Sequence, residues 1–253
     1  SCGVKVRMSE DFKHIEVDGP VKIKAFDKVI PSDWEAVAFP LIAALITDSE
    51  ITIDNVDLSG TQGDEAIVEV LKSLGADIEL DKQTCSLKVR GGTKANNGTG
   101  RLSTELLKDN ELHVNLSGFP DAVCALAAIS CFVEGTVFIE DIGVCRRKET
   151  DRIKVLKSEL EKLGAQVEEG EDFLVIHGHS PVLADGKPNP EFVLYGAEVE
   201  SYLDHRVAMS LACLGLGLKE GHEVKVKDAE CCSVSFPEFF EAMNKIGAGF
   251  TQV

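Results

Sequence analysis

Residues 145–154, CRRKETDRIK, bring together the groups that anion binding and proton transfer require. From Arg146 to Arg152, six of seven side chains are charged, and four of these are basic. The chain as a whole is acidic, with 26 Lys and Arg against 43 Asp and Glu and a formal net charge of −17. Cations gathered on an acidic chain indicate a site for an anion, and carboxylates among them could move protons. The alternative is a solvated run of local ion pairs.

Two further polar groups begin segments with an apolar, helical pattern. Pro120-Asp121 precedes one such segment and Asp204-His205-Arg206 precedes another, while Thr150 stands near the predicted start of a third. Cations at the start of a helix oppose its dipole, so stability does not explain them. Free backbone N–H groups at such a place do favour a bound anion. For Asp121 the simpler alternative is an N-cap, which is compatible with a catalytic role.

An internal repeat relates these helix starts to one another. Segments that begin at Asp33, Asp121 and Asp204 each run through an apolar stretch, a turn, an alternating strand and a second helix that ends on Gly-Ala. The distance from the Asp to that Gly is 42, 43 and 43 residues. Three agreements of this kind indicate structural repeats. Approximate symmetry between similar units predicts that their helix starts lie together at one end of the domain.

The repeat predicts an α/β fold. After the Gly-Ala pair, alternating hydrophobic residues on both sides of a polar turn predict a hairpin, so each unit reads strand–helix–strand–helix–strand–strand. The apolar first helices should lie inside and the sheets outside. We expect units at about 30–95, 111–180 and 190–253, which together form one domain, 30–253. Residues 1–29 have the same hairpin pattern, which predicts the tail of a missing N-terminal domain in a longer protein.

Composition excludes several classes of function. The acidity argues against nucleic-acid or membrane partners, no apolar run is long enough to span a bilayer, and the N-terminus has no signal-peptide core. The eight cysteines show no metal-ligand spacing, and Cys124, Cys131 and Cys213 fall in apolar helical patterns. We therefore expect reduced core thiols, no metal, no cofactor and a cytoplasmic location.

Several motifs resemble those of the EPSP synthase (3-phosphoshikimate 1-carboxyvinyltransferase) family. They are QGD at 62–64, PDA at 120–122, KETDR at 148–152, DHR–AM at 204–209 and SFPEFF at 235–240. The resemblance covers nearly the whole chain and matches the C-terminal half of that family. It implies an enolpyruvate-transferase-type domain in which the 5-hydroxyl of shikimate 3-phosphate attacks C2 of phosphoenolpyruvate, after which phosphate leaves.

The same resemblance assigns roles to residues. Asp121 would take the proton of the attacking hydroxyl, and Glu149 would act as the acid–base group near the methylene carbon. Lys148 would contact the phosphate of shikimate 3-phosphate. Cationic contacts of this kind would stabilise the charge that the reaction carries.

Two arginines would bind the second substrate. Arg152 and Arg206 would hold the carboxylate of phosphoenolpyruvate through paired N–H donors, with His205 beside them. We expect both arginines to be solvated site cations that contribute little to folding.

Two positions depart from the family pattern. Val234 stands where a lysine is usual, and Val144 where a polar residue is common. Since the family's N-terminal half supplies the other wall of the cleft, the isolated chain is expected to be inactive and to need that half as a partner. Two alternatives remain open: a non-catalytic anion-binding domain derived from the enzyme, and an enolpyruvyl transferase with another acceptor.

Overall fold

The computed structural model describes residues 3–252, so Ser1, Cys2 and Val253 of the expected segments 1–29 and 30–253 lie outside the described residues. The chain divides into two compact units, one that ends at Pro31 and one that begins at Ser32. Each unit is described by itself.

The first unit contains the predicted hairpin. Strands β1 (Val6–Met8) and β2 (Ile15–Val17) pair antiparallel, and Arg7 binds the carboxylates of Glu16 and Asp18 across them. The apolar side chains of both strands are exposed.

The second unit begins with the first repeat. Its elements are α1 (Trp34–Leu45), β3 (Glu50–Ile53), α2 (Ile67–Ser73), β4 (Asp77–Asp81) and β5 (Ser86–Arg90). The strands form one antiparallel sheet in the order β3-β5-β4. A parallel bridge between Ser32 and Val56 takes the place of the predicted first strand.

The middle repeat shows the full predicted pattern. Its elements are β7 (Glu111–Asn115), α3 (Val123–Ser130), β8 (Val133–Glu140), α4 (Arg152–Lys162), β9 (Gln166–Glu169) and β10 (Leu174–Gly178). Strand β7 pairs parallel with β8, and β10 lies antiparallel between β8 and β9. The short β6 (Leu102–Ser103) adds a second parallel partner to β8.

The last repeat is shorter. It has β11 (Glu198–Glu200), α5 (His205–Leu216), β12 (Lys225–Lys227) and α6 (Phe239–Lys245), and its two strands pair parallel. Residues 246–252, the last that the structure describes, contain no strand, so the predicted closing strand pair is missing there.

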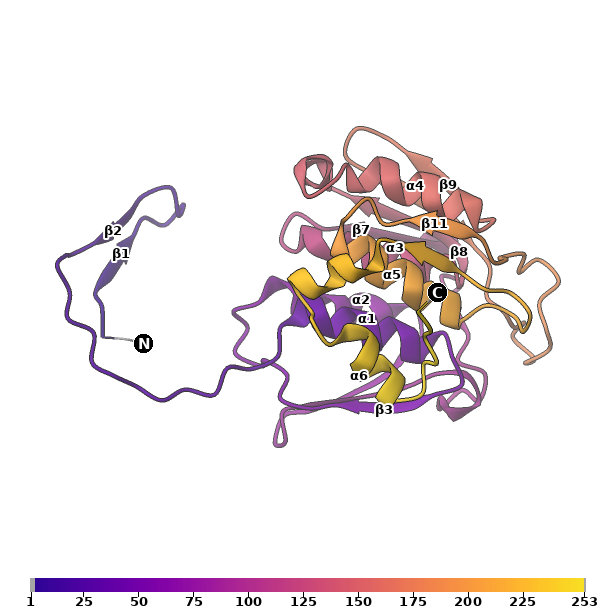
Figure 1. Ribbon diagram of the computed structural model, residues 1–253, viewed down its shortest axis with the longest axis horizontal. Helices are drawn as coiled ribbons and strands as arrows, with labels where there is room; N and C mark the ends of the chain where they lie inside the picture. The colour runs from indigo at the N-terminus through magenta and orange to yellow at the C-terminus, as the bar shows by residue number, and fades with distance from the viewer. Residues whose placement is uncertain (1–2, 253) are drawn as a thin grey trace. The chain divides into compact units, whose positions relative to one another are not determined.

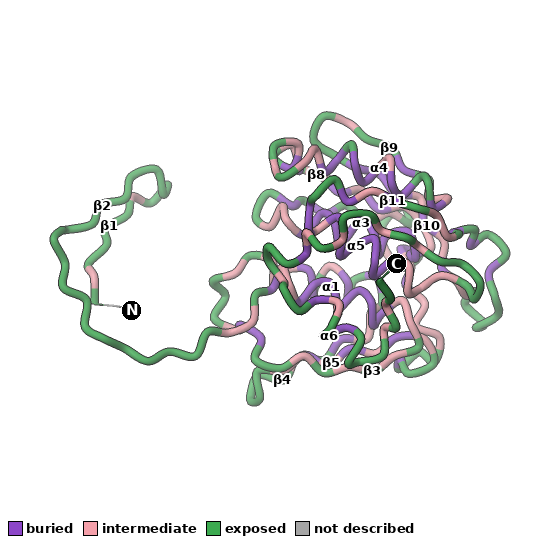
Figure 2. The backbone as a smooth tube through the Cα atoms, in the orientation of Figure 1, coloured by how far each residue is buried: buried purple, intermediate pink, exposed green. Residues whose placement is uncertain are grey.

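The core lies between the first helices of the three repeats. Helices α1, α3 and α5 contact one another, and every residue of α3 is buried (Figures 1 and 2). The outer strands β3, β9 and β12 have mostly exposed or half-buried side chains. The prediction of helices inside and sheets outside is therefore confirmed. Apolar residues all round each first helix explain this, because such a helix is stable only when it is buried on all sides.

Aspartates fix the start of three helices. Asp33, Asp151 and Asp204 cap α1, α4 and α5, and each side chain accepts a hydrogen bond from a backbone N–H two or three residues later. Helix α4 accordingly begins at Arg152, two residues after the predicted position. Among residues 3–252, no helix combines the length and the apolar character needed to cross a bilayer.

Candidate active site

The starts of the first helices meet at one end of the second unit. Arg152, the first residue of α4, binds Asp121 just before α3 and Asp204 at the start of α5. Arg206 of α5 binds Glu35 in the first turn of α1. The predicted meeting of the three helix starts is therefore confirmed.

Arg152 is the centre of this cluster. Its Nε lies 2.8 Å from Oδ2 of Asp204, and Nη2 lies 3.2 Å from Oδ1 of the same carboxylate. Nη1 lies 2.5 Å from Oδ1 of Asp121, and Nη2 also lies 2.7 Å from Oε2 of Glu149. Both Arg152 and Asp204 are 0% exposed. The planar guanidinium of Arg152 therefore pairs with carboxylates from three segments of the chain.

The burial of Arg152 corrects one expectation. We predicted a solvated cation that contributes little to folding, but only 1% of the Arg152 side chain is exposed. A buried charge remains stable only when it is paired and hydrogen-bonded, as it is here. Arg152 is thus a structural element of the cluster whatever else it does.

The other two cations are more accessible than Arg152, but only 12% of the Arg206 side chain is exposed, so the expectation of a solvated cation is wrong for Arg206 as well. Lys148 Nζ lies 3.0 Å from Oδ2 of Asp121, with 27% of its side chain exposed. Arg206 pairs with Glu35 and has its Nε 3.9 Å from Oδ1 of Asp121. Burial lowers the pKa of the Arg206 guanidinium, although the carboxylate of Asp33 acts in the opposite direction. Asp121 therefore lies among three cations.

Asp121 does not act as an N-cap, so that alternative is wrong. It lies in the short 3-10 turn Pro120–Ala122 that leads into α3, and no side chain caps that turn or the helix. Both of its oxygens instead bind cations from the 148–152 segment. Glu149 is the most exposed carboxylate of the cluster, at 45%.

The remaining sequence candidates differ in accessibility. His205 begins α5 directly before Arg206 and is 5% exposed, and its carbonyl oxygen lies 3.8 Å from Sγ of Cys232. Val234 and Val144, where the family pattern has polar residues, are both exposed on the surface.

Sequence reasoning missed three carboxylates. Asp204 was part of a quoted motif, but its burial was not foreseen, and Glu35 had no local signal. Asp64 lies in the quoted QGD motif, and its Oδ1 is buried without a hydrogen-bond partner among the described residues. Burial raises the pKa of the Asp64 carboxyl, and the carboxylates of Asp121 and Asp33 raise it further.

The raised pKa of Asp64 predicts a pH-dependent stability. Below the unfolded pKa the carboxyl is neutral in both states, and above the raised folded pKa its ionised form costs folding free energy. We expect Asp64→Asn to raise the Tm at pH 7 by about 2–4 °C, which corresponds to about 1 kcal/mol, and to change it little at pH 3. Thermal unfolding at the two pH values measures this.

The control for Asp64→Asn is Asp54→Asn, which removes the same charge from an exposed position. Equal gains from both variants would attribute the effect to the net charge of the chain and would contradict the assignment to the buried oxygen.

Gly63 fixes the location of Asp64, because a Cβ at Gly63 would lie 2.5 Å from the carbonyl oxygen of Gly118.

Comparisons with known proteins point to one family. A sequence model of the EPSP synthase (3-phosphoshikimate 1-carboxyvinyltransferase) family matches residues 1–243. A 3-phosphoshikimate 1-carboxyvinyltransferase of Methanosarcina acetivorans is 34% identical over 255 residues, 100% of this chain and 52% of the relative. One from Ruminiclostridium cellulolyticum is 33% identical over 235 residues, 93% of this chain and 48% of the relative.

A solved structure is similar as well. An EPSP synthase from Acinetobacter baumannii superposes with a TM-score of 0.75 and 25% sequence identity, covering 98% of this chain and 52% of that one. The chain spans about half the length of the relatives it matches. On the match to the family model and these relatives, the chain belongs to the EPSP synthase family.

Proposed function

We propose that this chain forms the C-terminal part of a 3-phosphoshikimate 1-carboxyvinyltransferase. The whole protein would transfer the enolpyruvyl group of phosphoenolpyruvate to the 5-hydroxyl of shikimate 3-phosphate and release phosphate. The observation that carries this proposal is the meeting of Lys148, Arg152 and Arg206 around Asp121, with Glu149 at the exposed edge. That set contains a base, an acid and cations for anionic substrates.

Asp121 suits the role of general base. Its Oδ1 contacts Arg152, and its Oδ2 contacts Lys148, which is the partly exposed cation. A substrate phosphate that attracts Lys148 would release Oδ2, while Arg152 would keep the carboxylate in place. The freed oxygen could then accept the proton of the attacking hydroxyl.

Carboxylates of the chain occupy the donors that phosphoenolpyruvate would use. Glu149 binds Nη2 of Arg152, and Glu35 binds Nη2 of Arg206. A substrate carboxylate would compete with these two side chains for the arginine donors, since each fork has few N–H groups left. Once displaced from Arg152, the Glu149 carboxylate could take up a proton from solvent and deliver it to the methylene carbon. His205 lies beside Arg206 and would help to shape this region.

The rest of the cleft would come from the N-terminal half of the same protein, which we propose as the partner of this chain. The isolated chain would then be inactive, because it provides only one wall of the cleft. The free cysteines, most of them buried, favour a reducing compartment and hence the cytoplasm.

One observation supports a second candidate function. Val234 is 77% exposed and stands where the family pattern places a lysine, so one anion contact is missing. A domain that kept anion binding but lost turnover would tolerate this change. This candidate predicts binding of phosphoenolpyruvate without transfer.

Shikimate 3-phosphate binding to the chain tests the anion site, because Lys148 is the cation expected to contact its phosphate. We expect weak, salt-sensitive binding, and Lys148→Ala should reduce the affinity about tenfold, the scale of one charge-assisted hydrogen bond. Isothermal titration calorimetry measures both. Lys154→Ala is the control, because Lys154 is an exposed lysine in the first turn of α4 and its loss changes the net charge equally. Equal effects of the two variants would show nonspecific attraction and refute the site.

A further inference from the structure

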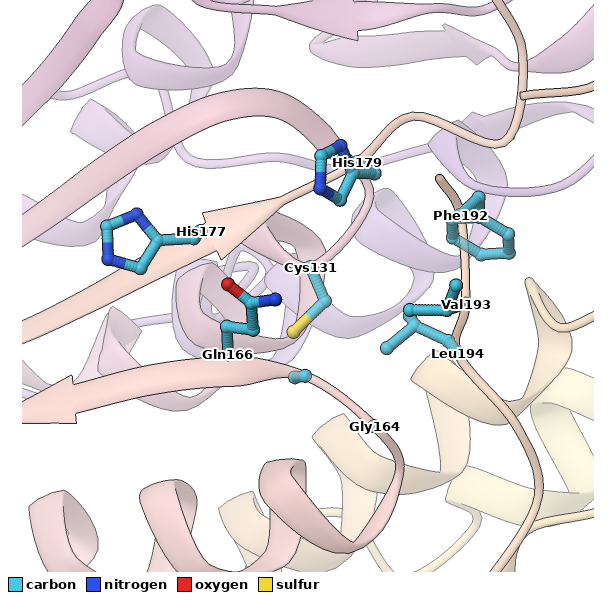
Figure 3. Close-up of a pocket in the computed structure, with 9 residues that line it drawn as sticks. Cys131, Gly164, Gln166, His177, His179, Phe192, Val193 and Leu194 are labelled. Carbon is cyan, nitrogen blue, oxygen red and sulfur yellow. The ribbon is translucent and has the colours of Figure 1, made fainter. Parts of the chain in front are cut away.

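A second polar cluster lies at the opposite end of the middle repeat. Glu134 is near the start of β8, His179 directly follows β10, and Glu191 lies in the segment before β11. The candidate active site surrounds the N-terminal ends of α3 and α4. A small pocket next to the second cluster is lined in part by residues that follow the C-terminal ends of these two helices. His179 borders this pocket together with Cys131, Gly164 and Phe192 (Figure 3).

One ligand atom from each of the three side chains lies close to the other two. His179 Nδ1 lies 3.2 Å from Oε1 of Glu134 and 3.6 Å from Oε2 of Glu191. All three atoms lie within 4.8 Å of one another. In a tetrahedral site with bonds of about 2.0–2.2 Å, neighbouring ligand atoms are about 3.3–3.6 Å apart. The His179–Glu191 separation lies at the upper end of this range, and the His179–Glu134 separation lies just below it.

Asn189 connects the three segments that carry these atoms. Its Nδ2 donates to Oε2 of Glu134 and to the carbonyl oxygen of Ser180, each at 2.9 Å, and its Oδ1 accepts from the backbone N–H of Glu191 at 3.0 Å. The Ser180 N–H also donates to Oε2 of Glu134. Asn189 is only 2% exposed. Hydrogen bonds to Oε2 fix the carboxylate and leave Oε1 directed at His179, the arrangement that outer-shell partners produce around metal ligands.

Another histidine of the chain shows that proximity to carboxylates alone does not create this geometry. His113 also has two carboxylate neighbours, but Glu140 contacts its Nδ1 and Glu111 contacts its Nε2, each at 3.3 Å. The two nitrogens face different sides of the ring, so no single ion could join all three groups. His113 is therefore a matched control for His179.

From this geometry we propose that Glu134, His179 and Glu191 form a binding site for a divalent transition-metal ion, with Zn²⁺ as the ion to test. One imidazole and two carboxylates are ligands that Zn²⁺ accepts, and water would complete the coordination. The side chain of Glu191 is 70% exposed, which gives the ion access. The ion would link the segment around Glu191 to β8 and would have a structural role there.

Zinc titration of the metal-free chain tests the proposal. The protein carries Cys85→Ser, because Cys85 is an exposed thiol that could bind zinc independently. We expect one Zn²⁺ per chain by isothermal titration calorimetry and a higher Tm with Zn²⁺ than with EDTA. Mg²⁺, which prefers six oxygen ligands, should bind at least tenfold more weakly.

Three variants distinguish a metal site from a network of hydrogen bonds. His179→Ala should abolish the zinc-dependent increase in Tm, and Glu191→Gln should lower zinc affinity at least tenfold. Glu191→Gln keeps the size of an exposed side chain, so it should fold normally and have the same Tm in EDTA. His113→Ala should bind zinc as the parent protein does. Absence of one-site binding, equal affinity in Glu191→Gln, or loss of binding in His113→Ala would each overturn the proposal.

Discussion

Replacement of Arg152 by alanine is expected to lower the free energy of unfolding by about 3–5 kcal/mol, the cost of leaving a buried charge without its partner. Asp204, which is 0% exposed, would lose both bonds to the guanidinium, and Asp121 would lose its shortest contact. Urea denaturation of the chain measures the change. If the loss of stability is large, a lower substrate affinity in an Arg152 variant could not be attributed to a lost substrate contact alone.

Arg90→Ala provides the control for this prediction. Arg90 also binds three carboxylates, those of Glu50, Asp77 and Glu79, but 16% of its side chain is exposed against 1% for Arg152, and Glu50 and Glu79 are exposed enough for water to replace their lost bonds. Its loss should therefore cost much less than that of Arg152. Equal effects of the two substitutions would show that burial does not set the cost. Arg152→Lys should be intermediate, since an ammonium keeps the charge but not the planar fork.

The repeat pattern made most of the fold predictable. Because Asp33, Asp121 and Asp204 begin equivalent segments, their meeting at one end followed from the sequence, and the motif at 148–152 then belonged beside them. In the same way, the apolar residues of the first helices predicted that these helices are buried. The closing strand pair of the last repeat was extrapolated from the first two, and residues 246–252 do not follow that pattern.

What the sequence could not show was which charges pair. Arg152 and Asp204 are 52 residues apart, and Arg206 and Glu35 are 171 apart, so only the packed helices bring them together. The expectation from the sequence was that Arg152 and Arg206 are solvated site cations. The fold instead turns Arg152 inward at the first position of α4, where Asp121 and Glu149 of its own repeat and Asp204 of the last repeat replace water.

The pairing of site cations with site carboxylates also has a functional meaning. Within the described residues the cations of the cluster pair with its own carboxylates, so under the proposed function substrates would exchange with Glu149 and Glu35 rather than bind open donors. These internal ion pairs keep the cations together when no substrate is bound, but they would lower the affinity for substrates. Enclosure by a second domain would recover affinity, because electrostatic attraction strengthens when water leaves a site.

Enolpyruvyl transfer is expected to appear only when this chain is combined with the missing part of a related enzyme. The chain alone should release no phosphate from phosphoenolpyruvate and shikimate 3-phosphate, because one wall of a cleft neither encloses nor orients two substrates. The partner is the portion of the Methanosarcina acetivorans relative that this chain does not match. The same portion mixed with the relative's own remaining part is the positive control for reassembly.

Asp121 and Glu149 then decide whether recovered activity comes from this chain. Asp121→Ala should reduce phosphate release by about 10²–10⁴-fold, the usual contribution of a general base, and Glu149→Gln should have a loss of similar scale. Lys154→Ala should leave the rate unchanged. Phosphate release by the isolated chain would show that the site is misplaced. An inactive complex, formed while the relative's own parts regain activity, would favour the non-catalytic anion-binding domain, because the cations would then hold substrates without the geometry that moves protons.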